Sequence, residues 1–234
     1  MTSYPLVLRA GLMVLEHDGL WLIDTGAPTS FSPRPHITLA GQQFNLADSL
    51  LGYTAEKISE LLGFEIAGLL GTDVVHGLDW IFDLPAGKAT ISDEPLAVSG
   101  NAVDLHCTLG VPVIPATVRG RSCRVIFDTG AELSYFPPEF LSGLSSNGQF
   151  RDFNPAIGWF DTDVYSLEAE IASYPVTLRA SRVSEDLGLM SMAFRMTDAE
   201  GLVGIQLCRE FRIHYAPRRG ILQVLTPASG PASG

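Results

Sequence analysis

The tripeptide Asp-Thr-Gly occurs twice in this chain, and both copies follow a run of apolar residues. The first copy stands at residues 24–26 in LIDTGAPTSF, and the second at residues 128–130 in IFDTGAELSYF. An aspartate that apolar neighbours carry toward the interior is costly to bury unless its charge is compensated. Two such aspartates in matched contexts predict that Asp24 and Asp128 meet in one site.

Two carboxyl groups that meet would supply an acid and a base in the same place. At a separation of about 3 Å they cannot both ionise, so they share one proton and titrate as a pair. The ionised member can take a proton from a trapped water while the protonated member hydrogen-bonds a carbonyl oxygen. We therefore expect Asp24 and Asp128 to be the catalytic residues of a hydrolase that needs no metal and no cofactor.

The other residues of the two triplets suit a supporting role. Gly26 and Gly130 lack a Cβ, so the backbone can turn tightly and bring its amides toward the carboxyl groups. Thr25 and Thr129 carry hydroxyls that can brace one half of the chain against the other, provided that each finds a buried partner. The alternative for either threonine is an ordinary β-branched strand residue.

The same series of elements is predicted around each triplet. A turn at residues 17–19 precedes the first copy and a turn at residues 119–122 precedes the second, each between short β-rich runs. An apolar-apolar-Gly step follows at 69–71 and again at 202–204, before a closing hairpin. This repeated order indicates an internal duplication that gives two homologous lobes.

The duplication predicts an all-β protein of two lobes. Residues 1–97 would form the N-terminal lobe, residues 98–226 the C-terminal lobe, and residues 227–234 a flexible tail without an apolar pattern. Within the first lobe we expect one strand at 36–46 and a helix at 54–63 that ends at its glycine. The longer second lobe carries extra extended runs at 164–184.

The doubled apolar-apolar-Asp-Thr-Gly-Ala motif, each copy followed by an apolar-apolar-Gly step, resembles the aspartic peptidases of the pepsin and retropepsin superfamily. The resemblance implies a bilobal acid-protease fold in which two retropepsin-like β-barrel lobes with short helices are related by a pseudo-twofold axis. Because both lobes lie in one chain, it also implies a monomer. The chain departs from the retroviral pattern after the glycine step, where the typical arginine is missing.

The residue after each triplet also bears on the chemistry. Pepsins usually carry Ser or Thr at this position, whereas this chain has Ala27 and Ala131, as retropepsins do. Without a hydroxyl donor to the ionised form, the apparent pKa values of the pair should be higher. We therefore expect activity to be greatest nearer about pH 5 than pH 2.

Members of this superfamily cover the site with a β-hairpin flap that excludes water. In the first lobe only the turn at 40–42 is available, so we predict that the flap comes from the second lobe. Its residues over the cleft would be Ile157, Gly158, Trp159 and Phe160. The alternative is that Trp159 and Phe160 are core residues of a strand.

The predicted function is that of an aspartic-type endopeptidase whose water is activated between two aspartates. Its partner would be an extended peptide or protein substrate, bound by backbone hydrogen bonds and side-chain pockets. One alternative is a catalytically silent peptide-binding module on the same fold. The other is a peptidase that processes only itself or a single partner.

Composition argues against several other classes. The formal charge is −11 and the basic residues are scattered, which argues against a nucleic-acid partner. The five histidines and three cysteines lack metal-binding spacings, so no metal site is predicted. No secretory signal or transmembrane segment is recognisable, and we therefore expect a cytoplasmic protein that does not bind membranes.

Overall fold

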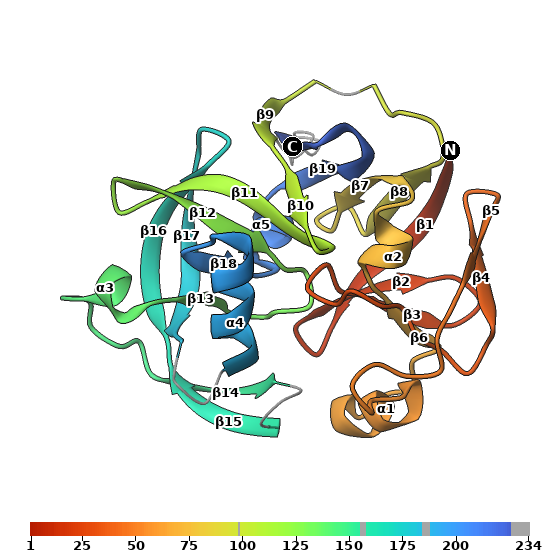
Figure 1. Cartoon of the computed structure of the whole chain (residues 1–234), viewed down its shortest axis with the longest axis horizontal. Helices are drawn as coiled ribbons and strands as arrows, with labels where there is room; N and C mark the ends of the chain where they lie inside the picture. The colour runs from red at the N-terminus through yellow and green to blue at the C-terminus, as the bar shows by residue number, and fades with distance from the viewer. Residues whose placement is uncertain (98, 155–157, 184–187, 226–234) are drawn as a thin grey trace, which may run out of the picture.

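Two β-rich lobes lie side by side, and the C-terminal strands lie between them (Figure 1). This computed structural model describes residues 1–97, 99–154, 158–183 and 188–225. The predicted tail at 227–234 and the predicted flap residue Ile157 lie outside the described residues. Strands predominate over short helices in both lobes, which confirms the predicted all-β, bilobal architecture.

The first lobe is built from hairpins and two short helices. Its elements are β1 (Thr2–Arg9), β2 (Leu12–Glu16), β3 (Leu20–Ile23), β4 (His36–Leu39), β5 (Gln42–Asn45), α1 (Ala55–Leu62), β6 (Gly68–Leu70), α2 (Thr72–Val75), β7 (Asp79–Asp83) and β8 (Lys88–Ser92). The predicted helix is α1, which Thr54 caps by accepting the Lys57 N–H and which ends at Gly63 with φ 75°. The single strand expected at 36–46 is instead the hairpin β4–β5, because Ala40 and Gly41 both have positive φ and reverse the chain.

The second lobe closes its main sheet into a barrel. Its elements are β9 (Asn101–Asp104), β10 (His106–Thr108), β11 (Val111–Val118), β12 (Arg121–Phe127), β13 (Ser134–Phe136), α3 (Pro138–Leu141), β14 (Gln149–Asn154), β15 (Gly158–Asp163), β16 (Tyr165–Ile171), β17 (Tyr174–Arg182), α4 (Gly188–Thr197), β18 (Gly201–Val203) and α5 (Gln206–Glu210). The sheet order is β10-β11-β12-β18-β13-β17-β16, and β11 also pairs with β16 at its end. The extended runs predicted at 164–184 form β16 and β17.

The strand that ends at each triplet has the same neighbour in both lobes. β3 runs parallel to β6, and β12 runs parallel to β18, so the glycine step packs beside the triplet each time. The backbone N–H of Asp24 donates to Leu70 O at 3.0 Å, and that of Asp128 donates to Val203 O at 2.9 Å. Each aspartate is thereby fixed at the end of a buried strand.

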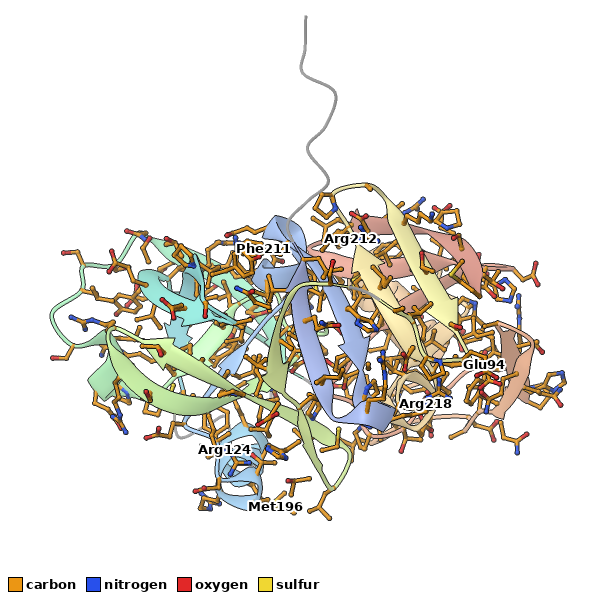
Figure 2. All side chains as sticks on the ribbon, turned by 90° about the horizontal axis from the view of Figure 1, so that it is seen from above. Glu94, Arg124, Met196, Phe211, Arg212 and Arg218 are labelled. Atoms are coloured by element: carbon orange, nitrogen blue, oxygen red, sulfur yellow. The ribbon has the colours of Figure 1, made fainter. Side chains whose placement is uncertain are left out.

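The C-terminal hairpin belongs to the sheet of the first lobe. It consists of β19 (Arg212–Ala216), the 3-10 turn η1 (Pro217–Arg219) and β20 (Ile221–Leu225). The sheet order is β6-β3-β2-β1-β8-β7-β19-β20-β9, and Figure 2 shows this hairpin in blue between the lobes. Strands from residues 101–104 and 212–225 therefore pair with the first lobe, and the predicted lobe boundary at 97/98 stays a prediction.

One hydrophobic core runs through both lobes. Tyr215 on β19 packs its ring 6.2 Å from that of Phe82 in the first lobe and 5.9 Å from that of Phe127 in the second. All three side chains are fully buried. Because Phe127 directly precedes Asp128, this packing fixes the second triplet relative to the first lobe.

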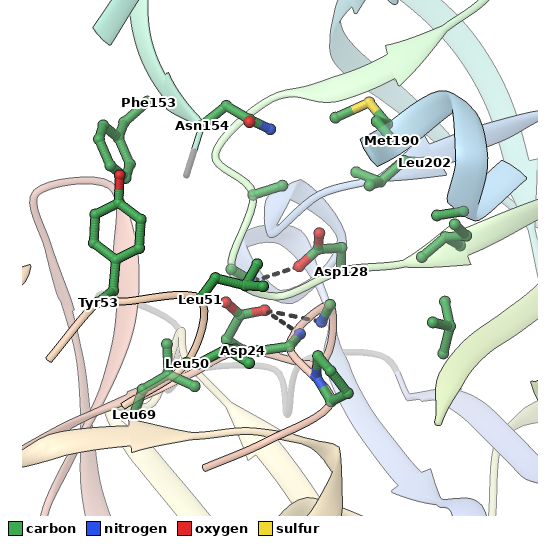
Figure 3. Close-up of a pocket in the computed structure, with 18 of the residues that line it drawn as sticks. Asp24, Leu50, Leu51, Tyr53, Leu69, Asp128, Phe153, Asn154, Met190 and Leu202 are labelled. Carbon is green, nitrogen blue, oxygen red and sulfur yellow. Dashed lines mark hydrogen bonds between the residues drawn. The ribbon is translucent and has the colours of Figure 1, made fainter. Parts of the chain in front are cut away.

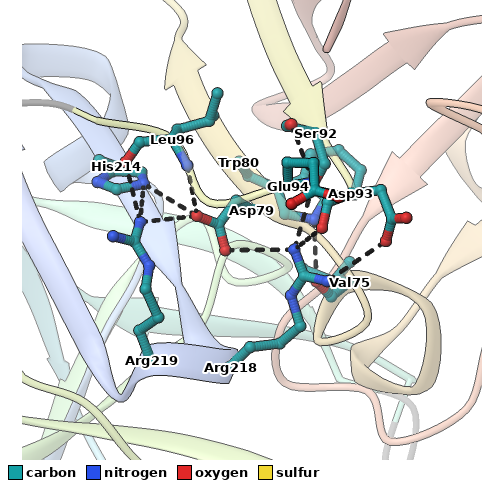
Figure 4. Close-up of polar contacts among 10 residues, drawn as sticks. All are labelled: Val75, Asp79, Trp80, Ser92, Asp93, Glu94, Leu96, His214, Arg218 and Arg219. Carbon is teal, nitrogen blue, oxygen red and sulfur yellow. Dashed lines mark hydrogen bonds and ion pairs between the residues drawn. The ribbon is translucent and has the colours of Figure 1, made fainter.

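A buried ionic cluster also ties the C-terminal hairpin to the first lobe (Figure 4). Asp79 on β7 is 1% exposed, and its Oδ2 accepts hydrogen bonds from Arg219 at 2.7 Å and from the Leu96 N–H at 3.0 Å. Arg218 lies 3.6 Å from the other carboxylate oxygen, and His214 lies 3.7 Å from Oδ2. The hairpin thus carries the cations, and the first lobe carries the carboxylate.

Candidate active site

Asp24 and Asp128 face each other on the floor of a cleft between the lobes (Figure 3). Asp24 follows β3 and Asp128 follows β12, so each lobe provides one carboxyl group. The two carboxyl groups lie within hydrogen-bonding reach of each other. The structure therefore brings together the two residues that the sequence singled out.

The two glycines of the triplets allow this close approach. A Cβ on Gly26 would lie 2.4 Å from Asp128 Oδ2, and a Cβ on Gly130 would lie 2.3 Å from the Asp24 carboxyl carbon. Real Cβ atoms do not approach so closely, so any side chain here would push the opposite aspartate away. Each glycine thus leaves room for the carboxyl group of the other lobe.

The two threonines of the triplets bond reciprocally beneath the aspartates. The Thr25 hydroxyl donates to Phe127 O at 2.7 Å and accepts the Thr129 N–H at 3.0 Å. The Thr129 hydroxyl donates to Ile23 O at 2.8 Å and accepts the Thr25 N–H at 3.1 Å. Both residues are fully buried, so all four hydrogen bonds are shielded from water.

The hydrogen bonds to the two carboxyl groups are unequal. Asp24 Oδ1 accepts the N–H groups of Gly26 at 2.8 Å and Ala27 at 3.0 Å. Asp128 Oδ1 accepts the Gly130 N–H at 2.9 Å. By these distances Asp24 has one more N–H donor for its charged form than Asp128 has, and the Gly26 N–H also lowers the pKa of Asp128.

The protonation of the pair follows from burial and from this inequality. Burial raises the pKa of Asp24 above its ordinary value, and the N–H groups of Gly26 and Ala27 oppose that rise. Burial raises the pKa of Asp128 well above its ordinary value, and the neighbouring charge of Asp24 raises it further. Burial and the charge of the neighbouring carboxyl group therefore favour a state in which the pair holds one proton.

The alanine after each triplet contributes a backbone hydrogen bond to the site but has no side-chain hydroxyl. Ala27 and Ala131 both line the cleft. Ala27 O accepts the Thr72 N–H at 2.8 Å, and Ala131 O accepts the Ile205 N–H at 2.9 Å. These bonds connect each triplet to the chain just beyond the glycine step, in the same way in both lobes.

The cleft above the aspartates is mainly apolar and has a volume of about 270 Å³. Apolar side chains from the first lobe include Phe31, Leu50, Leu51, Ile58 and Leu69, and those from the second include Val111, Ile126, Phe160, Met190, Ala193 and Leu202. Such a lining can exclude water from the carboxyl pair and bind apolar groups of a ligand.

Aromatic residues from the two lobes meet in the lining of the cleft. The ring of Tyr53, which precedes α1, lies edge-on to that of Phe153 on β14, with centroids 6.0 Å apart at 87°. Phe153 in turn packs against Trp159 on β15 at 5.4 Å. Figure 3 shows the two rings end to end, to one side of Asp24 and Asp128. We call this Tyr53–Phe153 contact the roof.

The residues predicted for the flap have different places in the hairpin β14–β15. Phe160 lines the cleft, whereas Trp159 is 44% exposed and lies on the other face of the strand. Alternation along the strand separates these neighbours, and Trp159 packs on Phe153, its cross-strand partner, so a role of Trp159 over the cleft stays a prediction. Gly158, with φ 79°, begins β15 and does not line the cleft, and Trp159 is not a core residue either.

The sequence reasoning missed a polar pair in the cleft wall. Tyr135 on β13 donates its hydroxyl to Asp152 on β14, and both residues line the cleft. Burial raises the pKa of Asp152, and the Tyr135 hydrogen bond opposes the rise. A signal existed in QFRDFN, where alternation places Asp152 on the same face as Phe150 and therefore facing inward.

The described residues offer neither a metal site nor a membrane span. No group of three or more His, Cys, Asp or Glu residues among them is arranged to hold a metal ion. All three cysteines are free, with Cys107 exposed and the other two buried. Within the same part of the chain, no helix is both long and apolar enough to cross a membrane.

Comparison with solved structures identifies the fold. An aspartic proteinase from Irpex lacteus matches with a TM-score of 0.55 and 12% sequence identity, covering 99% of this chain and 99% of its own. The simian foamy virus protease covers 40% of this chain and 87% of its own, at TM-score 0.30 and 17% identity. A retropepsin-like aspartic protease from Rickettsia conorii covers 56% of this chain and 96% of its own, at TM-score 0.38 and 17% identity.

The full-length match carries the assignment, and the chain has the bilobal fold of the pepsin-like aspartic proteinases. At 12% identity this likeness concerns the fold alone. No protein-family model matches the chain, and no curated protein matches it as a relative.

Proposed function

We propose that the protein is an aspartic endopeptidase in which Asp24 and Asp128 activate a water molecule to hydrolyse peptide bonds. The observation that carries this proposal is the meeting of the two carboxyl groups on the floor of an apolar cleft. The glycines and threonines of both triplets support it, because they hold the pair at close range from both sides.

The unequal hydrogen bonding assigns a role to each aspartate. Asp24, with two N–H donors, is the base that takes a proton from the water as its oxygen bonds to the carbonyl carbon. Asp128 is the acid that gives its proton to the carbonyl oxygen. When the C–N bond breaks, the leaving nitrogen takes the proton gained by Asp24, and the hydroxyl of the intermediate returns a proton to Asp128.

The shape of the cleft favours a peptide in extended form. It lies between two lobes that each contribute backbone and apolar side chains, so side chains that alternate along an extended peptide can enter either wall. Both aspartates come from one chain, and we therefore propose that a monomer is active. The matched hydrogen bonds of the two triplets support an origin of the lobes in an internal duplication.

The proposal is tested by cleavage of a diverse peptide library between about pH 3 and pH 7.5, the range in which a carboxyl pair with raised pKa values changes its charge. We expect Asp24→Asn and Asp128→Asn each to lower cleavage by about a thousandfold or more, because each removes an acid–base group. Asp104→Asn is the matched control, since Asp104 is exposed and does not line the cleft.

A peptide inhibitor with a hydroxyl in place of the scissile bond separates the enzyme from a silent binding module. An enzyme should bind it more tightly than the matching substrate, because it resembles the transition state, whereas a silent module should show no such preference. Tight inhibitor binding without cleavage of the library would indicate a peptidase with a single dedicated substrate. Absence of both would overturn the proposal.

A further inference from the structure

The wall of the second lobe places a third carboxyl group in the cleft. Asp152 Oδ2 accepts the hydroxyl of Tyr135, and its Oδ1 accepts the Phe153 N–H at 2.8 Å. Tyr135 is 3% exposed and fixed in β13, so its hydroxyl holds the carboxyl group in place. The mechanism proposed above has no use for this group.

Nothing positive in the lining balances Asp152. Among the described residues that line the cleft, Asp24, Asp128 and Asp152 are acidic, and none is Lys, Arg or His. Arg179 approaches Asp152 from β17 but does not line the cleft. Arg179 lies instead 3.3 Å from Glu132, which Arg209 also contacts at 3.4 Å. The cleft is therefore short of positive charge.

The surroundings of the Tyr135 side chain are apolar. Tyr135 belongs to the same hydrophobic cluster as Leu202, and Phe160 and Met190 pack against that cluster. All of these residues line the cleft. A ligand side chain that reaches Asp152 along this wall would thus need an apolar stem and a positive tip, as lysine and arginine have.

We propose that Asp152 determines specificity by binding a lysine or arginine side chain of the substrate on the second-lobe side of the cleft. The inference rests on the proposed endopeptidase function for the reaction, but the binding of the basic side chain can be measured without it. An ion pair in a partly desolvated wall discriminates strongly, since an uncharged side chain would leave the charge of Asp152 without a cation in the cleft.

A purely structural role for Asp152 makes a different prediction. Because Tyr135 on β13 and Asp152 on β14 connect the body of the lobe to the hairpin, their hydrogen bond could serve only to hold the hairpin. Asp152→Asn separates the two roles, because the amide oxygen still accepts the tyrosine hydroxyl while the charge, and with it the acceptor of the Phe153 N–H, is lost. Asp161→Asn is the matched control, because Asp161 lies exposed on the same hairpin and does not line the cleft.

The experiment compares peptide pairs that differ at one position, with lysine in one member and norleucine in the other. Each position on both sides of the cleaved bond is tested, and the readout is the ratio of kcat/KM within each pair. We expect the wild type and Asp161→Asn to favour lysine by about tenfold or more at one position, and Asp152→Asn to lose that preference. The series covers the active pH range, because burial raises the pKa of Asp152 and only the ionised form attracts lysine.

A second arm measures binding of the same labelled peptides to the Asp24→Asn protein, with and without Asp152→Asn. If no peptide is cleaved but lysine peptides bind more tightly and this depends on Asp152, the subsite stands and the proposed peptidase function fails. If peptides are cleaved without a preference for lysine, or if the preference persists in Asp152→Asn, the subsite proposal is overturned. Equal binding of both peptides in an uncleaved series overturns both.

Discussion

Thr25 and Thr129 lock the two lobes together directly beneath the carboxyl pair. Each hydroxyl donates to a main-chain carbonyl of the opposite lobe and accepts the backbone N–H of the other threonine. Since each threonine directly follows an aspartate, the same bonds that join the lobes also set the separation of Asp24 and Asp128. Stability and catalytic geometry are therefore coupled at this point.

Removal of the Thr25 hydroxyl should destabilise the protein. Thr25→Val keeps the side-chain shape but leaves Phe127 O without its donor and the Thr129 N–H without its acceptor, which costs about 1–3 kcal/mol for each buried group. The free energy of unfolding in urea measures the loss. Thr25→Ser is the control, because it retains the hydroxyl. Equal stability of the valine and serine variants would contradict the argument.

The stability of the wild type should depend on pH through Asp128. Its pKa in the folded state is raised well above the ordinary aspartate value of about 3.9, so folding favours the protonated form. That stabilisation is complete below the ordinary value and is lost as pH rises through the raised pKa. Residue 128 no longer titrates in Asp128→Asn, so we expect the wild type to lose stability relative to this variant as pH rises above about 4.

Thermal unfolding of both proteins at several pH values tests this expectation. The exposed control Asp104→Asn should follow the wild type at every pH. A constant difference between the wild type and Asp128→Asn would show that the carboxyl pair titrates alike in the folded and unfolded states.

A hydroxyl after the second triplet should move the pH dependence of activity. Ala131→Ser adds a donor beside Asp128 that favours its ionised form, and one net hydrogen bond of about 1 kcal/mol corresponds to about 0.7 pH unit. In the plot of kcat/KM against pH, ionisation of the acid Asp128 sets the decline on the high-pH side. We expect this decline to shift to lower pH by about that amount. Ala131→Cys, with a weak donor of similar size, should shift less. An unchanged serine profile would exclude this role.

The roof should be closed in solution if its ring contact is stabilising. Edge-to-face aromatic pairs contribute about 0.5–1.5 kcal/mol beyond their buried area. A double-mutant cycle with Tyr53→Ala and Phe153→Ala should therefore give a coupling energy of that size in urea unfolding. Tyr53→Ala combined with Tyr174→Ala is the control pair, because Tyr174 packs against Phe211 instead. A coupling near zero would indicate an open cleft in the free protein.

Structural features that occur in both lobes are easier to predict from the sequence than features that occur only once. Local sequence signals mark the strand ends before both triplets, both glycine steps and the capped helix α1. The structure has all of these elements where they were expected. The roof carries no such signal, because Tyr53 and Phe153 are 100 positions apart and neither lies in a repeated motif. The exposure of Trp159 depends on the phase of β15, which begins at the turn and which the local pattern does not give.

Pairing between distant strands is the other feature that local patterns miss. The hairpin β19–β20 closes the second half of the chain in sequence, but it pairs with β7 of the first lobe. β19 and β7 are both apolar strands in the sequence. Hydrophobic periodicity alone therefore cannot distinguish pairing within a lobe from pairing across lobes. The buried Asp79 and the arginines that meet it, which occupy this junction, are visible only once the strands are paired.

The ionic cluster at Asp79 should contribute strongly to the attachment of the C-terminal hairpin. Asp79→Asn would remove the charge of the buried carboxylate, and because the Arg219 side chain is itself 33% exposed, we expect a loss below the value of about 3–5 kcal/mol that is typical of a fully buried ion pair. Asp93→Asn is the matched control, because Asp93 is 56% exposed and contacts Arg218, and such surface pairs contribute about 0–1 kcal/mol. Urea unfolding measures both variants, and hydrogen exchange of the β19–β20 amides shows whether the hairpin detaches first. Equal, small losses in the two variants would mean that strand pairing and the Tyr215 core hold the hairpin without the buried charges.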